Sequence, residues 1–514
     1  MLYTVTSTLP PVHGGRTKAL LNRIQLMYED LNEKNTILTT NYNPNYQEVI
    51  ASFVENNKLN AEIEVENIYD WLSDFKLLNN PHTYNGSVKY HEVEREIDGL
   101  TSEIRNNKDV VRYYNEETYF LYRKFKPGTN ILEFEDFMTP YCKKRVERHL
   151  YNTYGQLHKK DYFSTKNYGK IAEKFYDTEG NKYCEKFFSD DKHGKLLLVQ
   201  LYKDGRHFKA FENEKQLFQY YFQSRLKDGD IVFNDARLLD EALLQQTNKT
   251  TNVLVFHSSH LAKSVKKSYE FALTHSKDVA KYIVLTHHQK EEIQNEFPIE
   301  DKRFAVIPHF LDVKSPSDQA LSFKDQFIYI GRFTVGKQLD HLIKAYKLFR
   351  EAGYTSKLVL YGKDEENQLK MIKGLVEEYG LNEYVEINGF TSNPLAEFKA
   401  SRASLLTSAF EGFGLTIMES IAVGCPVISY DVKYGPKEII AHGQNGYLVE
   451  PNNIEDVAKR MMEIIDTPLT NVKNNKRLKY EAAVNNYAEL LKQLKKQESK
   501  LGSRIIQTFK HSCQ

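Results

Sequence analysis

Strand-like and helix-like segments alternate at the start of the chain. Residues 2–7 alternate apolar and polar positions as a strand does, and RTKALLNRIQLMYEDLNEK, residues 16–34, carries apolar residues at helical spacing. A turn with the sequence PPVHGG joins the two, and residues 35–42 follow as a second strand. This order predicts an alternating α/β domain with a parallel sheet.

The pattern changes after about residue 75. Short runs rich in Tyr, Phe, Lys and Asn replace the long apolar helices, and turns such as DTEGNK, SDDKHGK and YKDGRH separate them. These are hairpin signals. We therefore interpret residues 80–212 as a β-rich insertion, whose aromatic faces need a second sheet or another subunit to cover them.

The α/β pattern then returns twice. DIVFND, TNVLVFHSSH, KYIVLTHHQ and FAVIPHF complete a first domain made of residues 1–79 and 213–312. After a polar linker, strand-like segments from FIYIGRF to GYLVEP alternate with helices and predict a second domain over residues 313–473, followed by a basic helical tail, residues 474–514. The predicted fold is α/β, with two doubly wound Rossmann-like domains facing across a ligand-binding cleft.

Charge and composition exclude several classes of protein. The 70 Lys and Arg residues against 69 Asp and Glu leave a net charge of +1, which disfavours a nucleic-acid partner, and 41% hydrophobic residues exclude a disordered chain. No stretch approaches the roughly 20 apolar residues that cross a bilayer, and no secretory signal is seen, so membrane contact is at most peripheral. Four distant cysteines without metal-ligand spacing indicate a cytoplasmic protein.

Two loops carry cations and glycines suited to phosphate. Gly331 and Arg332 follow a strand, and Lys337 comes five residues after Arg332, before a helix. An arginine fork and a lysine point charge there can clamp a diphosphate, although a solvated basic turn has the same pattern. In the opening turn, Gly14 and Gly15 let backbone N–H groups approach a phosphate, although a tight structural turn also uses such a pair.

A third loop, in SAFEGFGLTIMES, carries two carboxylates. Glu411 precedes the loop, and Glu419 lies one turn into the helix that begins near its end. Carboxylates in these places suit paired hydroxyl groups, a sugar at one end and a ribose at the other, whereas isolated acids usually lie on the surface. The loop residues expected to contact the same ligand are Gly412, Phe413, Gly414 and Leu415.

These motifs resemble a known family. Arg332, Lys337, Glu411 and Glu419, with GCPVI and HGQNGYLV, are similar to family 4 of the retaining nucleotide-sugar glycosyltransferases, which have the GT-B fold. The insertion, the HGGRTK opening and the DVKYGP run resemble the wall teichoic acid α-glycosyltransferases, and among them the poly(glycerol-phosphate) α-glucosyltransferases. The resemblance implies α-glucose transfer from UDP-glucose to poly(glycerol phosphate), with retention.

The resemblance also implies roles for these residues. Arg332 and Lys337 would hold the diphosphate of a UDP-sugar and stabilise its charge as the glycosidic bond breaks. Glu419 would bind the ribose and Glu411 the donor sugar. The glycine pair of the opening turn would let the first domain close over the sugar phosphate.

A histidine would lie near C6 of the donor sugar. His257 and His260 are both candidates, and His260 is favoured because the functional histidine of similar enzymes follows the strand rather than lying within it. His287 and His288, in LTHHQ, are further candidates for the cleft. A core or surface role remains the alternative for each.

The implied mechanism needs neither cofactor nor metal. Similar enzymes use a front-face displacement in which the leaving phosphate accepts the proton of the acceptor. The sequence Asp228-Gly229-Asp230, just before a strand, is interpreted as a turn and not as a metal site. The KYGPKE loop departs from the family, which often has a glycine pair there, so Pro436 constrains the backbone, and Glu438 is interpreted as a structural cap.

The insertion and the tail are the candidate contacts with partners. The resemblance suggests a homotrimer formed through the insertion, and KPGTN, CKKRVERH and QLHKKDYF interleave cations with aromatics that could hold an anionic polymer; a solvated face explains them equally well. The lysines of the tail would face water or meet the polymer.

Two other functions stay open. One is α-N-acetylglucosamine transfer to poly(ribitol phosphate) or to serines of a secreted adhesin. The other is a non-catalytic GT-B-fold binding partner, against which the four intact charged residues argue.

Overall fold

The computed structural model divides into two compact units, which are described separately. The first comprises residues 1–12 and 35–250, and the second residues 13–34 and 251–514. The predicted boundaries at 79/80 and 312/313 lie outside the described residues, and the other predicted domain boundaries stay predictions. The structure describes residues 1–11, 14–77, 90–105, 108–262, 264–311 and 322–511, with side chains up to residue 496.

The first unit contains a parallel ladder in the order β3-β2-β1-β14. β1, β2 and β14 are almost fully buried, as expected for a parallel sheet covered on both faces, whereas β3 begins at an exposed residue. The two strands predicted at residues 2–7 and 35–42 are confirmed. The bounds are β1 (Leu2–Thr6), β2 (Asn35–Thr39), β3 (Glu64–Asn67) and β14 (Ile231–Asn234), with α2 (Tyr46–Glu55), α3 (Ile68–Leu72), α4 (Glu214–Arg225) and α5 (Asp240–Leu244).

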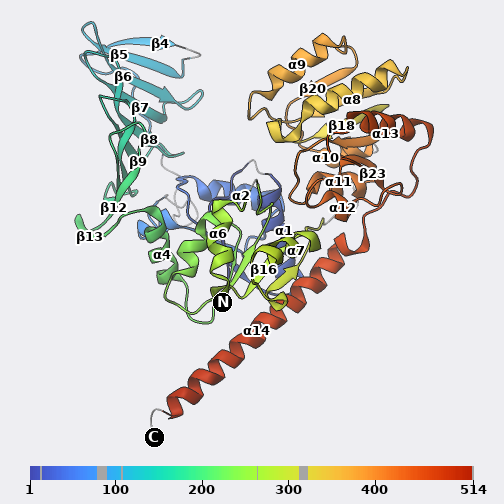
Figure 1. Ribbon diagram of the computed structural model, residues 1–514. Helices are drawn as coiled ribbons and strands as arrows, with labels where there is room; N and C mark the ends of the chain where they lie inside the picture. The colour runs from blue at the N-terminus through green and yellow to red at the C-terminus, as the bar shows by residue number, and fades with distance from the viewer. Residues whose placement is uncertain (12–13, 78–89, 106–107, 263, 312–321, 512–514) are drawn as a thin grey trace. The chain divides into compact units, whose positions relative to one another are not determined.

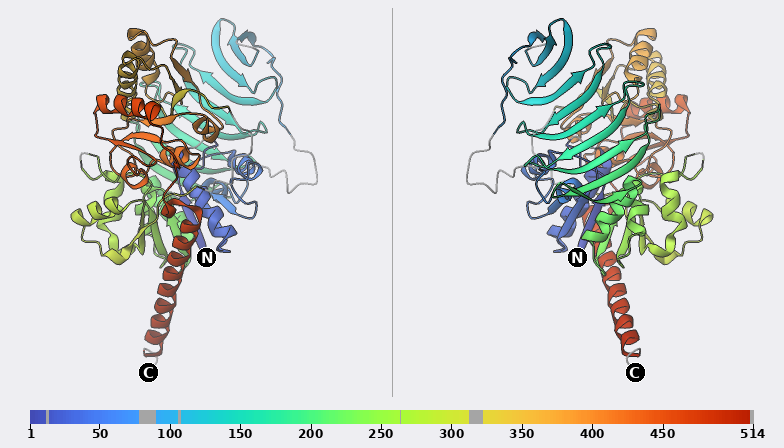
Figure 2. Two further views of the ribbon diagram at one scale, coloured as in Figure 1. Left: turned by 90° about the vertical axis from the view of Figure 1, so that its right-hand side faces the viewer. Right: turned by 90° about the vertical axis from the view of Figure 1, so that its left-hand side faces the viewer.

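The β-rich insertion is a single ten-stranded antiparallel sheet. Each strand pairs with its neighbours in sequence, from β4 at one edge to β13 at the other (Figures 1 and 2). The predicted turns DTEGNK and YKDGRH are confirmed, with Gly180 and Gly205 in the left-handed region that favours glycine. The strands are β4 (Thr101–Arg105), β5 (Val110–Asn115), β6 (Thr118–Phe125), β7 (Leu132–Met138), β8 (Arg145–Tyr151), β9 (Leu157–Phe163), β10 (Lys170–Tyr176), β11 (Lys182–Phe188), β12 (Leu196–Lys203) and β13 (Arg206–Phe211).

Residues of the same unit cover parts of this sheet. The sequence analysis expected a second sheet or another subunit to cover its aromatic faces, so these parts differ from that expectation. At the β10–β12 end, Phe175 and Val199 share a core with Tyr69 and Tyr221 of the parallel half. At the other end, Val93, Ile97 and Leu100 pack on the buried residues of β5 and β6. The insertion is therefore anchored by its own hydrophobic contacts within the unit.

The second unit contains a six-stranded parallel sheet in the order β20-β19-β18-β21-β22-β23. In chain order this is 3-2-1-4-5-6, which confirms the predicted doubly wound arrangement. The strands are β18 (Gln326–Ile330), β19 (Lys357–Tyr361), β20 (Val385–Asn388), β21 (Ala403–Leu406), β22 (Val427–Tyr430) and β23 (Gly446–Val449), and the helices are α8 (Leu339–Glu351), α9 (Gln368–Glu378), α10 (Pro394–Lys399), α11 (Leu415–Ala422), α12 (Pro436–Ile439) and α13 (Ile454–Asp466).

The same unit holds a second parallel ladder, β15-β16-β17, and the helix of the opening segment. β15 and β16 are almost entirely buried, whereas β17 is only partly buried, and Figure 1 labels the accompanying helices α1, α6 and α7. The bounds are α1 (Gly15–Glu29), β15 (Thr251–Val255), α6 (Lys267–Thr274), β16 (Lys281–Val284), α7 (His287–Glu296) and β17 (Phe304–Val306).

The tail forms one long helix, α14 (Tyr480–His511), drawn in red in Figure 1. It packs on α1, where the Tyr480 hydroxyl donates to Asp30 at 2.5 Å and Lys495 pairs with Glu33. The leucines at 490, 491 and 494 are buried. These contacts fix residues 480–495 of α14 against α1 and the segment that follows it.

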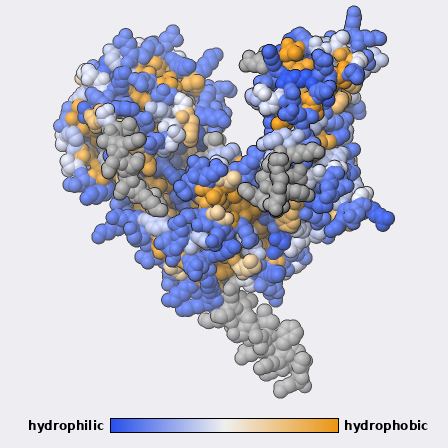
Figure 3. Space-filling model, turned by 180° about the vertical axis from the view of Figure 1, so that it is seen from behind, coloured by the Kyte–Doolittle hydropathy of each residue, from blue (hydrophilic) through white to orange (hydrophobic). Residues whose placement is uncertain are grey.

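The described surface is mainly polar. On the face drawn in Figure 3, hydrophilic residues dominate and hydrophobic residues form smaller groups among them. Among the described residues, no helix combines the length and the apolar character that a membrane span requires.

A buried histidine in the first unit makes the stability of this unit depend on pH. Burial, with Lys159 nearby, lowers the pKa of His158 to about 3, and the Tyr42 hydroxyl bonds its Nδ1 at 2.5 Å. The unfolded chain has an ordinary histidine pKa near 6.5, so it binds more protons below that pH. His158 therefore does not reduce the free energy of unfolding above about pH 6.5. As the pH decreases from about 6.5 to 3, this free energy falls by up to about 1.4 kcal/mol per pH unit.

We expect His158→Gln to reduce the loss of thermal stability between pH 7 and pH 5. His193→Gln, in an exposed turn, is the matched control and should keep the wild-type difference. Thermal unfolding at the two pH values measures this. An identical pH dependence in wild type and His158→Gln would contradict the assignment.

Candidate active site

The cationic loop begins where β18 ends. A Cβ on Gly331 would lie 2.6 Å from the Tyr329 hydroxyl, so the loop needs glycine there. Arg332 is 65% exposed, and its Nη1 lies 3.0 Å from a carboxylate oxygen of Glu365. Lys337 ends a short 3-10 turn directly before α8. As predicted, both cations lie in a loop that leads into a helix.

Lys337 forms an ion pair with Glu411. The two side chains are only 22% and 12% exposed, and the Ser408 hydroxyl donates to the same carboxylate oxygen at 2.8 Å. Thr407 fixes the lysine backbone by donating to the Lys337 carbonyl at 3.2 Å. Because the local dielectric is lower than in water, this pair is stronger than an exposed one. The structure thus joins one predicted cation to one predicted acid and leaves Arg332 paired elsewhere.

The glycine loop after Glu411 lies against the segment that follows β15. A Cβ on Gly412 would lie 2.8 Å from the His257 carbonyl oxygen and 2.9 Å from the Ser258 Cα. Gly414 has a φ of +92° and directly precedes α11, which begins at Leu415 as predicted. Phe413, between the two glycines, is buried. The loop can approach this closely because its glycines carry no side chains.

Glu419 is held by a lysine that the sequence analysis did not single out. It is buried one turn into α11, and Lys18 Nζ lies 2.5 Å from its carboxylate. A Cβ on Gly15 would lie 2.6 Å from Leu415 Cδ1, so α1 and α11 meet at their first residues. Gly14 directly precedes α1. Two helix N-termini lie together there and provide partial positive charge for an anion.

The histidines after β15 differ in burial. The strand ends at Val255, so His257 and His260 both follow it, and the expectation that His257 lies within the strand was wrong. His260 is fully buried, and burial, with Lys266 and Lys433 nearby, lowers its pKa to about 4. His257 is partly exposed and stacks on His309 at 5.4 Å between ring centroids.

The loop after β22 joins these elements. The Glu411 N–H donates to the Lys433 carbonyl at 2.8 Å, and the Tyr434 N–H donates to the Glu411 carbonyl at 2.5 Å. The Lys433 ammonium pairs with Glu292 of α7. Nothing in the periodicity of the sequence indicated these contacts; the only signal in the sequence was the departure of the KYGPKE loop from the family pattern.

The remaining histidine candidates lie at the start of α7. The His287 N–H donates to the Glu438 carboxylate at 2.8 Å, and Arg477 pairs with that carboxylate. Glu438 therefore caps α7, which confirms its interpretation as a structural residue. Pro436 is the first residue of α12, where its missing N–H costs nothing. His288 is exposed and contacts the Tyr434 ring edge-on, with 5.4 Å between centroids.

The Asp-Gly-Asp segment before β14 is a turn, as predicted. Gly229 has a φ of +84°. The Lys249 N–H donates to Asp228 and the Lys227 N–H donates to Asp230, both at 2.7 Å. The turn therefore uses both carboxylates to bind backbone groups.

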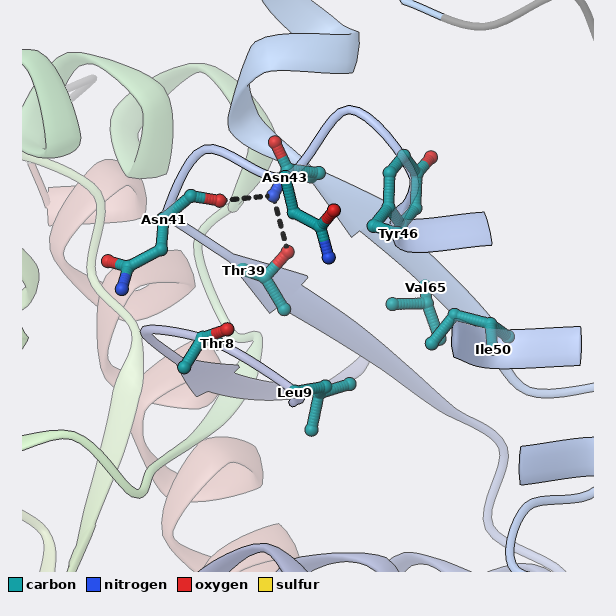
Figure 4. A pocket seen from close by; sticks show the side chains of 9 residues that line it. Thr8, Leu9, Thr39, Asn41, Asn43, Tyr46, Ile50 and Val65 are labelled. Carbon is teal, nitrogen blue, oxygen red and sulfur yellow. Dashed lines mark hydrogen bonds between the residues drawn. The ribbon is translucent and has the colours of Figure 1, made fainter. Parts of the chain in front are cut away.

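A separate polar pocket lies in the first unit (Figure 4). It is found at the carboxyl ends of β1, β2 and β3, where open α/β sheets bind ligands. The Asn67 amide donates to the Thr39 hydroxyl at 3.0 Å and to the Asn41 carbonyl at 2.8 Å. The sequence analysis did not identify this pocket. Its lining is Thr8, Leu9, Thr39, Asn41, Asn43, Tyr46, Ile50, Val65 and Asn67.

Comparisons with known proteins agree with the motifs of the second unit. Residues 315–501 match the family described as "Glycosyl transferases group 1". The chain is 26% identical over 466 residues to a poly(ribitol-phosphate) alpha-N-acetylglucosaminyltransferase of Staphylococcus aureus (strain COL), covering 88% of this chain and 90% of that protein. It is 24% identical over 492 residues to a poly(glycerol-phosphate) alpha-glucosyltransferase of Bacillus subtilis (strain 168), covering 92% of this chain and 71% of that protein.

Solved structures confirm the expected fold. A point mutant of S. aureus TarM, solved with Fondaparinux, alpha-GlcNAc-glycerol and UDP, superposes with a TM-score of 0.77 at 21% identity, covering 96% of this chain and 95% of that one. A GtfA/B complex gives a TM-score of 0.63 at 19% identity, covering 96% and 99%. The fold is GT-B, with an antiparallel sheet inserted.

The close approach of the glycine loop predicts a stability effect. A methyl group in Gly412→Ala meets backbone atoms that cannot move aside, so we expect a loss of about 1–3 kcal/mol. Gly389→Ala is the matched control, because a Cβ there meets nothing within 4 Å. Chemical denaturation of both variants measures the difference. Equal stability of the two would show that the loop does not pack as described.

Proposed function

We propose that this chain, whose residues 315–501 form a group 1 glycosyl transferase domain within a GT-B fold, is a teichoic acid α-glycosyltransferase. Its reaction is α-glucose transfer from UDP-glucose to hydroxyls of poly(glycerol phosphate), with retention. The observation that carries the proposal is the partly buried Lys337–Glu411 ion pair inside that domain. The relatives named for poly(ribitol-phosphate) and poly(glycerol-phosphate) transfer support it.

The donor would bind to the charged side chains of the second unit. Lys337 and Arg332 would bind the diphosphate, and the paired N-termini of α1 and α11 would add partial positive charge. Glu411 would accept hydrogen bonds from the donor sugar, and Glu419 from the ribose. Both acids are already oriented by lysines, so the site needs little rearrangement to bind.

Retention would follow from a front-face route. The acceptor hydroxyl would attack from the side of the leaving diphosphate, whose oxygen takes the hydroxyl proton as the glycosidic bond breaks. Lys337 and Arg332 would then neutralise the released UDP. In this scheme Glu411 positions the sugar through hydrogen bonds and forms no covalent bond to it.

The acceptor would use the first unit. The ten-stranded sheet carries cations beside aromatic rings, such as Lys174 over Tyr162 and Lys182 over Tyr202, which suit a phosphate polymer with apolar carbon segments. We also propose a homotrimer formed through this sheet, and an enzyme that works on the cytoplasmic side with at most peripheral membrane contact.

A second candidate function is the same kind of transfer reaction with a different donor and a different acceptor. The S. aureus relative, which matches over 90% of its length, is named for N-acetylglucosamine transfer to poly(ribitol phosphate), and this supports that pair equally. Transfer to serines of a secreted protein is a further variant, supported by a GtfA subunit of Streptococcus gordonii that is 26% identical over 417 residues.

One experiment separates these candidates. The purified protein is incubated with radiolabelled UDP-glucose or UDP-N-acetylglucosamine and with poly(glycerol phosphate), poly(ribitol phosphate) or a serine-rich protein. Label in poly(glycerol phosphate) from UDP-glucose supports the first proposal. Label transferred in another combination of donor and acceptor supports the corresponding alternative function. Binding of UDP without any transfer would support a non-catalytic binding protein.

Lys337→Ala should abolish most transfer. It removes the diphosphate cation and leaves the Glu411 charge without its partner, so we expect a fall in kcat of about 100-fold or more. Lys344→Ala, in the following helix turn where the lysine pairs with Asp340, is the matched control and should stay near wild type. Wild-type turnover by Lys337→Ala would refute the assignment of the site.

Transfer should also persist without divalent metal. Two cationic side chains supply the charge that a metal would otherwise provide, so treatment with EDTA should leave the initial rate within about twofold. The measurement is the initial rate before and after dialysis against EDTA. A loss that Mn²⁺ or Mg²⁺ restores would overturn this part of the proposal.

A further inference from the structure

Lys266 is a partly buried lysine without a carboxylate partner. It directly precedes α6, and its N–H donates to the His260 carbonyl at 2.8 Å. Its ammonium donates to the Ser259 carbonyl at 2.7 Å. Among the residues that the structure describes, no carboxylate forms an ion pair with this ammonium, and burial lowers its pKa. The backbone therefore holds the ammonium in place and leaves its charge uncompensated.

The Phe410 ring lies beside this lysine. The Lys266 ammonium is 5.9 Å from the centre of the ring, and Phe410 is 58% exposed. The backbone on both sides of Phe410 is held: the Ala409 N–H donates to the Gly336 carbonyl at 2.9 Å, and the Glu411 N–H also donates to a backbone carbonyl, as described above. The loop therefore presents an apolar surface at a fixed position, next to the uncompensated cation and one residue before an acid of the candidate active site.

Two other lysines of the candidate active site differ from Lys266 in this respect. Lys337 forms an ion pair with Glu411. Lys18 forms an ion pair with Glu419. Charges that are withdrawn from water are normally paired in proteins. A lysine that is held beside the site without a counter-ion therefore indicates the place of an anionic group of a ligand.

The acceptor, and not the donor, has a phosphate left for this lysine. Under the proposed function, Arg332 and Lys337 bind the diphosphate of the donor, and a UDP-sugar carries no further phosphate. A poly(glycerol phosphate) chain, in contrast, alternates phosphodiester charges with segments of C–H groups. An ammonium binds phosphate oxygens, and an exposed phenyl ring packs against C–H groups. A cation beside an apolar ring therefore matches the alternation of the polymer.

We propose that Lys266 and Phe410 form a subsite for one phosphodiester unit of the acceptor, with the phosphate on the lysine and the adjoining carbon segment on the ring. The subsite selects a phosphate polymer over a serine-rich protein, because a serine side chain brings no phosphate. It is distinct from the cations of the inserted sheet, which belong to the first unit. The inference rests on the proposed function for the transfer reaction, but binding of a phosphate polymer can be measured without any donor.

The first test measures transfer to a short oligo(glycerol phosphate). Lys266→Met keeps the length of the side chain without its charge and should raise KM for this acceptor about tenfold or more. It should leave kcat and the affinity for UDP within about twofold, because the phosphate contact is the same before and during transfer. Lys266→Arg should restore most of the loss, and high salt should reduce the difference. An unchanged KM, or weaker UDP binding, in Lys266→Met would overturn the proposal.

Two matched pairs of variants separate the subsite from general attraction. Lys267→Met removes the exposed neighbouring lysine and should keep the wild-type KM, unlike Lys266→Met. Phe410→Leu should raise KM about threefold. Phe323→Leu should not, although Phe323 is 62% exposed and its ring centre lies 5.2 Å from the Arg402 guanidinium. Equal effects within either pair would show attraction that does not depend on the subsite and would overturn the proposal.

The second test measures binding without donor, by the fluorescence anisotropy of a labelled oligo(glycerol phosphate). If the wild type transfers no sugar to any acceptor, the proposed function fails, while weaker oligomer binding by Lys266→Met still supports the subsite. Equal binding by the two proteins, or no binding by the wild type, overturns the proposal. Should Lys266→Met prove unfolded, Lys266→Gln replaces it with the same expected loss, because its amide can still donate to the Ser259 carbonyl.

Discussion

The candidate active site depends on the close approach of the loop from Glu411 to Leu415 to two other segments. Gly412 lies against the backbone of residues 257–258, and Leu415 lies against Gly15. At Gly412 this approach requires glycine, because a side chain there would meet backbone atoms. The two contacts bring the N-terminus of α11 beside that of α1, and each of the two acids, Glu411 and Glu419, then meets a lysine from another segment.

The charged groups of the candidate site differ in how far they are buried. Lys337 and Glu411 are mostly buried, so solvent screens their pair little, whereas Glu419 is buried but its partner Lys18 is 40% exposed. Arg332 is exposed and pairs with Glu365 at the surface, where an ion pair contributes little stability and a ligand phosphate can readily replace the carboxylate. The same site thus combines preset acids with an exposed cation, which suits binding and release of a nucleotide diphosphate.

The aromatic faces of the inserted sheet are covered in two ways. Ten antiparallel strands present two aromatic faces, and the parts at each end are covered by residues of the same unit rather than by a second sheet. Lysine and arginine side chains lie over many of the other rings and pair with nearby acids. Cations over rings keep such a face compatible with water.

The sequence by itself determined the local elements and the residue types of the site. Apolar periodicity placed the strands of both sheets, the glycine turns placed the hairpins, and the spacing of Glu411 and Glu419 placed one acid in a loop and the other in a helix, because these features depend on neighbours in the chain. Only the tertiary structure paired Lys18 with Glu419, Lys433 with Glu292 and Tyr434 with His260, since partners 401, 141 and 174 residues apart leave no periodic signal. It also showed that His260 is buried and His257 partly exposed, because burial depends on packing and both follow the same strand.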